Sequence, residues 1–188
     1  MRRPDRLRVN AQGDLENQEF FYDGKTLALY HKKENLYALA SMPPTIDEAL
    51  TKAHRDFDLQ VALTDLVCSN AYELLTRHIR HKLYVGLHPV RGVPCHHLAF
   101  DKDNYQWQIW VEAGDKPLPR KMLITQKKLL GSPQWTAYLT DWNLAAQLPD
   151  SLFTFVPPAG ALQTKFLPPA KAAATKTKPP GKKKGAKS

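Results

Sequence analysis

The densest group of chemically reactive side chains lies in residues 78–97. It contains one thiol and five imidazoles: Cys95, His78, His81, His88, His96 and His97. Zinc prefers thiolate and imidazole ligands. However, His96 and His97 are adjacent, so on a strand they point to opposite faces. His78 and His81 have basic neighbours, which disfavour a cation. We therefore expect no metal site and interpret these histidines as ordinary residues of a strand and a helix end.

Cys95 and His97 are two residues apart, so on a strand they share one face and could form a nucleophile and base. Such a pair also needs a third group that orients the base, and a cleft, and the sequence indicates neither. A phosphate-binding glycine loop, a dinucleotide fingerprint, a nucleophile elbow and a His-Glu-x-x-His helix are all missing from the sequence. We expect no catalytic residues, no cofactor and no enzymatic activity.

The elements that position these residues begin with short strands. Apolar segments at 7–9, 20–22, 26–31 and 36–41 are typical of antiparallel strands, and Asp23-Gly24 supplies the positive φ that a tight hairpin needs. After Pro43-Pro44 the period becomes helical. Thr45 and Glu48 form a capping box before a helix at about 45–56, and a second helical segment follows at about 63–80. These segments predict a helical pair that interrupts the strands.

From Lys82 to about Phe155 the two-residue period returns, interrupted by turn signals at 89–92, 102–104, 114–117 and 131–133. This pattern predicts five or six meander strands. Their length suggests one large curved sheet with a strongly apolar face. We assign twelve residues to that face: Leu83, Val85, Leu87, Leu98, Phe100, Tyr105, Trp107, Ile109, Met122, Ile124, Trp135 and Leu139.

The net charge of +9 is concentrated at the C-terminal end, because residues 165–187 contain eight lysines and no acidic residue. The remaining chain has 19 basic and 18 acidic residues. Residues 168–188 are rich in Lys, Pro and Ala and predict a disordered tail. The tail is either a solubilising appendage or a nonspecific binding arm for nucleic acid or another anionic surface, through lysines that include Lys182, Lys183, Lys184 and Lys187. No window approaches the roughly 20 apolar residues of a transmembrane helix.

Several short motifs together resemble an uncharacterised family of predicted periplasmic proteins over residues 2–167. These motifs are Arg-Pro-Asp-Arg-Leu at 3–7, Tyr-Asp-Gly-Lys-Thr at 22–26, Cys-His-His-Leu-Ala-Phe at 95–100, Trp-Gln-Ile-Trp at 107–110, Pro-Leu-Pro-Arg-Lys at 117–121 and Phe-Thr-Phe-Val-Pro-Pro at 153–158. The family is grouped with the LolA/LolB-type lipoprotein carriers. That grouping implies an open antiparallel half-barrel with a helical lid over its apolar concavity.

The resemblance also implies a signal peptide, an N-terminal helix and initial strands before the Arg-Pro motif. Met1 leads directly into that motif, so we expect an N-terminally incomplete domain. Location in the periplasm or cell envelope is implied by the resemblance, whereas a true start at Met1 would place the protein in the cytoplasm. The lysine-rich tail is a departure from the family pattern.

The sequence thus predicts a mainly β, α+β domain over residues 1–167, an open antiparallel half-barrel whose central lid lies at about 45–80. The expected function is binding of a hydrophobic or lipidated ligand on the concave apolar face, at the twelve residues given above. The alternative is a structural or polyanion-binding protein that acts through the tail.

Overall fold

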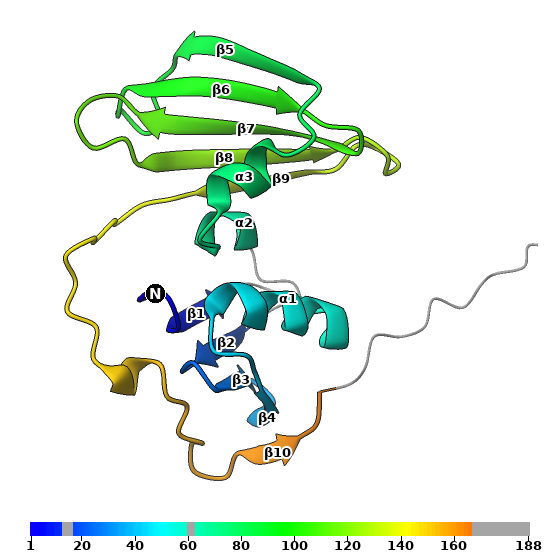
Figure 1. Ribbon diagram of the computed structural model, residues 1–188, viewed down its shortest axis with the longest axis vertical. Coiled ribbons are helices and arrows are strands. Elements are labelled where there is room, and N and C mark those ends of the chain that lie inside the picture. The colour runs from blue at the N-terminus through cyan, green and yellow to red at the C-terminus, as the bar shows by residue number, and fades with distance from the viewer. Residues whose placement is uncertain (13–16, 60–62, 167–188) are drawn as a thin grey trace, which may run out of the picture. The chain divides into compact units, whose positions relative to one another are not determined.

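The computed structural model describes residues 1–12, 17–59 and 63–166, and the predicted tail at 168–188 lies outside them. The described chain is mainly β and forms two open sheets of five strands each (Figure 1). This confirms the predicted fold class and is compatible with an open half-barrel. The meander strands predicted from residue 82 onward form one of these sheets, and the first four predicted strands belong to the other. The chain divides into two compact units, one of Met1–Thr64 with the segment from Pro149 onward, the other of Asp65–Leu148.

The sheet of the first unit contains four antiparallel strands, β1 (Leu7–Gln12), β2 (Asn17–Tyr22), β3 (Thr26–His31) and β4 (Leu36–Ser41). All four were predicted. The β2–β3 hairpin turns at Gly24, whose φ is +89°. The carboxylate of Asp23 accepts hydrogen bonds from the backbone amides of Lys25 and Thr26, at 3.0 and 2.8 Å. Gly24 therefore supplies the positive φ that the sequence predicts for this turn, and Asp23 adds hydrogen bonds across it.

Helix α1 (Ile46–Phe57) follows this sheet and matches the helix predicted at 45–56. The Thr45 hydroxyl accepts a hydrogen bond from the Glu48 amide at 3.3 Å, as an N-cap does. The helix ends at Asp58, which has a left-handed φ of 52°. Four apolar residues at helical spacing are buried: Ile46, Ala49, Leu50 and Ala53. Their burial fixes the helix to the first unit.

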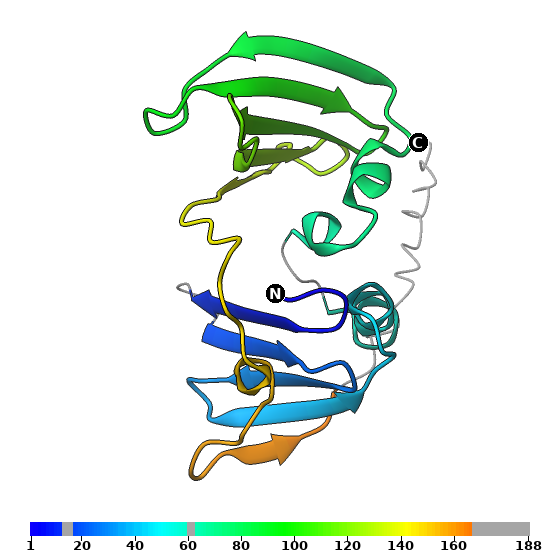
Figure 2. The same ribbon diagram turned by 60° about the vertical axis from the view of Figure 1, so that its left-hand side comes forward.

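The C-terminal segment returns to the first unit. Pro149 is followed by a single 3-10 turn, η1 (Asp150–Leu152), and then by Phe155, whose ring lies 5.3 Å from the rings of Phe21 and Tyr37. Figure 2 shows this segment, in yellow, crossing the first sheet. The prediction that the meander continues to about residue 155 is therefore wrong. Phe153 and Phe155 alternate as in a strand, yet Phe155 packs against aromatic rings of the first sheet.

A last strand, β10 (Leu162–Thr164), pairs in parallel with β4. Three residues are too few to show an alternating pattern, so this strand could not be predicted from the sequence.

The second unit contains the short helices α2 (Thr64–Val67) and α3 (Ala71–Thr76), which replace the continuous helical segment predicted at 63–80. Five antiparallel strands follow in meander order, as predicted: β5 (His81–Leu87), β6 (Cys95–Asp101), β7 (Tyr105–Glu112), β8 (Pro119–Gln126) and β9 (Gln134–Tyr138). The residues predicted as one lid thus supply α1 to the first unit and, from Asp65 onward, the helices α2 and α3 to the second (Figure 1).

Candidate functional site

The strand register divides the second sheet into two faces. Leu98 pairs with Ile109, and Phe100 pairs with Trp107, so these four side chains share one face. We call it the lid face, because Asp65 of α2 and Leu75 of α3 line a cavity together with it. Its members in β6 to β9 include Leu98, Phe100, Trp107, Ile109, Met122, Ile124 and Trp135. We call the other side the far face; it carries Cys95, His97, Gln108 and Trp110.

A cavity of about 130 Å³ lies between the lid face and the two short helices. Trp107 and Met122, each 4% exposed, are the most deeply buried residues of its wall. The full lining is Asp65, Leu75, Tyr105, Trp107, Met122, Ile124 and Gln126. We call it the apolar cavity.

Four of the twelve residues that we assigned to a ligand-binding face, Tyr105, Trp107, Met122 and Ile124, line the apolar cavity. Leu98, Phe100 and Ile109 lie on the same face outside its wall. Trp135 pairs with Ile124 but is 42% exposed, and Leu139 comes after the last residue of β9. Asp65, Leu75 and Gln126 were not among the residues predicted to bind a ligand. Leu75 could have been included, because it belongs to an apolar helical pattern in the sequence.

Strand β5 departs from the predicted arrangement. Leu83 pairs with Ala99 and so lies on the far face, while Tyr84 pairs with Leu98 on the lid face. A bulge between Tyr84 and Gly86 contains Val85, and Leu87 then returns to the lid face opposite His96, where it is 60% exposed. The assignment of Leu83 to the ligand-binding face is therefore corrected. The alternation within one strand does not reveal which of its two faces aligns with the next strand, and a bulge shifts it again.

A second and more polar cavity, of about 320 Å³, also lies in this unit. Its lining is Asp65, Leu74, Arg77, His78, Lys102, Asp103, Asn104 and Tyr105. We call it the polar cavity. Lys102 is only 8% exposed, and its ammonium donates a hydrogen bond to the carbonyl of Leu74 at 3.2 Å. The same ammonium lies 5.3 Å from the centre of the Tyr105 ring. Nothing in the sequence indicates that Lys102 belongs to a site, because a single lysine after a strand is ordinary.

On the far face, Cys95 is fully buried with Val90 and Trp110. Its thiol donates to the carbonyl of Val93 at 3.3 Å. Burial raises the pKa of this thiol, because the thiolate would lose its hydration. Cys95 is therefore a poor nucleophile in this setting.

The two adjacent histidines of β6 point to opposite faces, as predicted. His96 Nδ1 lies 3.0 Å from the Tyr84 hydroxyl on the lid face, and His97 Nε2 lies 2.8 Å from Gln108 Oε1 on the far face. Burial lowers the pKa of His97, so its neutral form is favoured. Within residues 1–12, 17–59 and 63–166, no three His, Cys, Asp or Glu side chains are grouped closely enough to share a metal ion.

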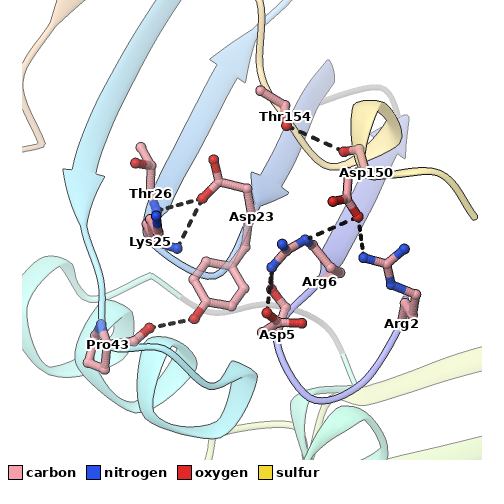
Figure 3. Close-up of polar contacts among 10 residues, drawn as sticks. Arg2, Asp5, Arg6, Asp23, Lys25, Thr26, Pro43, Asp150 and Thr154 are labelled. Carbon is pink, nitrogen blue, oxygen red and sulfur yellow. Dashed lines mark hydrogen bonds and ion pairs between the residues drawn. The ribbon is translucent and has the colours of Figure 1, made fainter.

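The motifs that carry the resemblance in the first unit form a network of structural contacts (Figure 3). Arg2 and Arg6 both face the carboxylate of Asp150 in the returning segment, and the Arg6 Nε to Asp150 Oδ1 distance is 3.8 Å. Arg6 also pairs with Asp5 at 2.6 Å, and the Tyr22 hydroxyl donates to the carbonyl of Pro43. These residues hold the N-terminal strand, the hairpin and the returning segment together, which is a structural role.

A protein-family model matches most of the chain. No curated protein sequence matches the chain. None of the helices in the described residues is long and apolar enough to cross a membrane. The model of a family described as "Predicted periplasmic protein (DUF2092)" matches residues 1–167, which include both sheets. Because this match covers most of the chain, the chain belongs to that family of predicted periplasmic proteins.

Proposed function

We propose that the protein binds a hydrophobic or lipidated ligand without catalysis, between the lid face of the second sheet and helices α2 and α3. The apolar cavity is the observation that carries this proposal, because its wall combines Leu75, Trp107, Met122 and Ile124 beneath a light cover. The family's description as periplasmic supports a location in the cell envelope. The resemblance to lipoprotein carriers favours the same ligand class.

Burial of apolar surface is sufficient for such a function. Each methylene removed from water contributes about 0.8 kcal/mol, and this term has no directional requirement. A cavity of about 150 Å³ holds one benzene molecule in a well-studied case. The apolar cavity, at about 130 Å³, therefore accepts one ring or the end of an acyl chain.

A longer ligand requires that the cover move. Helices α2 and α3 have four and six residues, and neither contributes a fully buried residue. Helix α1, in contrast, buries four apolar residues, so α2 and α3 are held less firmly than α1. The light cover is compatible with entry of a ligand from this side.

Two lysine substitutions test the proposal. Ile124→Lys places a charge in the wall of the apolar cavity, whereas Leu130→Lys makes the same kind of change at a fully exposed residue of the same unit that lies outside that wall. Propylbenzene, an uncharged ligand with one ring, serves as the probe in isothermal titration calorimetry. We expect its binding to be lost in Ile124→Lys and kept in Leu130→Lys, with circular dichroism showing that both variants fold. Equal binding by the wild type and a folded Ile124→Lys variant would refute the proposal.

The alternative function, polyanion binding through the lysine-rich tail, concerns residues outside those that the structure describes. It predicts that deletion of residues 168–188 abolishes binding to heparin and leaves probe binding unchanged. Heparin binding that survives the deletion would exclude the tail as the binding element.

A further inference from the structure

The apolar and polar cavities of the second unit share two wall residues. Asp65 and Tyr105 line both, so the cavities are neighbours at the junction of α2 with the start of β7. One is walled mainly by apolar and aromatic side chains, and the other by charged and amide side chains. A pair of cavities with these two characters fits a ligand that has an apolar part and a polar end.

Lys102 identifies the charge that the polar end would carry. Its side chain is buried, and no carboxylate in the described part of the chain lies within 4.0 Å of its ammonium. The ammonium has three N–H donors, and its hydrogen bond within the protein goes to the neutral carbonyl of Leu74. A buried cation with neutral partners is costly, and an anion beside it removes much of that cost.

Two other charged residues of the polar cavity, Arg77 and Asp103, have partners within the protein. Arg77 pairs with Glu73 at 3.5 Å, and Asp103 pairs with Arg80. Asp65 is exposed to solvent, which screens its charge. The ammonium of Lys102 is therefore the charge in this wall that an incoming anion would meet with the least screening.

We propose that the ligand is a single-chain amphiphile that ends in a carboxylate. Part of its acyl chain occupies the apolar cavity, and its carboxylate binds the ammonium of Lys102 in the polar cavity. This inference rests on the proposed function and adds to it the charge of the ligand and the residue that recognises it.

Isothermal titration calorimetry with three ten-carbon probes tests the inference on the full chain. Decanoate, decanol and decyltrimethylammonium have the same chain length and differ in the charge of the head, and each is used below its micelle-forming concentration. We expect the wild type to bind decanoate at least about tenfold more tightly than decanol, as a charge-assisted hydrogen bond predicts. Decyltrimethylammonium is expected to bind more weakly than decanol.

Lys102→Met removes the ammonium and retains an unbranched apolar side chain. We expect its affinity for decanoate to fall to that for decanol, while its affinity for decanol stays within about twofold of the wild type. Lys128→Met is the matched control, because Lys128 is an exposed lysine of the same unit outside both cavity walls. The preference for decanoate should persist in this control. If Lys102→Met does not fold, Lys102→Arg, which keeps the charge, takes its place. The ratio of the affinities for decanoate and decanol, measured in the wild type and in Lys102→Arg, then tests the role of the charge.

The outcomes separate the two proposals. Equal affinities of the wild type for decanoate and decanol would overturn the role of Lys102 and leave hydrophobic binding in place. A preference for decanoate that persists in folded Lys102→Met would also overturn it. The lack of binding of any probe would overturn the proposed function itself.

Discussion

The rings of Phe100 and Trp107 stack across β6 and β7, with centroids 4.1 Å apart and planes inclined by 17°. Trp107 lines the apolar cavity, so the stack fixes the position of one wall of the candidate site. The indole Nε1 of Trp107 is buried and has no hydrogen-bond partner among the described residues. The ring is thus held by its apolar contacts, and its one polar atom contributes nothing favourable to the folded state.

Substitution of Trp107 separates these two effects. Trp107→Phe keeps an aromatic ring and removes the unsatisfied donor, whose burial costs about 1–3 kcal/mol. The gain offsets the packing that the smaller ring loses, and we expect the free energy of unfolding to change by less than about 1 kcal/mol. Trp107→Ala should lower it by about 3–5 kcal/mol. Urea denaturation measures both, and equal losses in the two variants would contradict this account.

Gly24 and Gly92 form a matched pair for a test of the network in Figure 3. Both have positive φ, +89° and +83°. A Cβ at Gly24 would lie 2.5 Å from Nη1 of Arg6, whereas a Cβ at Gly92 would meet nothing within 4 Å. Each alanine variant incurs the backbone strain of about 1–2 kcal/mol, and only Gly24→Ala also displaces Arg6. Urea denaturation should show a larger loss for Gly24→Ala, and a larger loss for Gly92→Ala would count against the network.

Tyr22 predicts how the first unit responds to alkali. Burial raises the pKa of its hydroxyl to about 12, because the phenolate would lose its hydration. In the unfolded chain the group titrates near its ordinary value of about 10. The unfolded state therefore loses its proton first, and stability falls as the pH rises from about 10 to about 12.

Tyr22→Phe should lack this alkaline loss. At neutral pH the variant should be less stable by about 1 kcal/mol, because the carbonyl of Pro43 loses its donor. Thermal denaturation at pH 7 and at pH 11 measures the difference. The same alkaline loss in both proteins would show that another group causes it.

Asp150 predicts the response to acid. Its hydrogen bond with Arg2 lowers the pKa of the carboxyl group below its ordinary value. The stabilising contribution is therefore present above the ordinary pKa of about 4 and is lost as the pH falls through the lower value of the folded state. Asp150→Asn should reduce the steepness of acid unfolding, measured by circular dichroism between pH 5 and pH 2. An unchanged acid profile would mean that the Arg2 contact has no effect on stability.

The sequence was most informative where a signal is local. The Thr45 cap, the Asp23-Gly24 turn and the alternation of β6 to β8 each depend on residues close together in the chain, and each was confirmed. Register between strands is not local. The face of Leu83 depends on how β5 aligns with β6, and the bulge at Val85 has no clear sequence mark.

The residues of the candidate site also differ in whether a local sequence pattern reveals them. Tyr105, Trp107, Met122 and Ile124 could be selected from their alternation alone. Asp65 and Lys102 could not be selected, because Asp65 reaches the site through a short helix with no periodic pattern. The burial of Lys102 becomes visible only when the carbonyl of Leu74, 28 residues away, is placed beside it.

The parallel pairing of β10 with β4 has a consequence for the order of events during synthesis. The sheet of the first unit is complete only when residues 162–164 join residues 36–38. All five strands of the second sheet, from residue 81 to residue 138, leave the ribosome before then. Because domains fold as units while the chain emerges, the nested second sheet can close while the first still waits for its last strand. The unit whose synthesis begins first is thus the unit whose sheet is completed last.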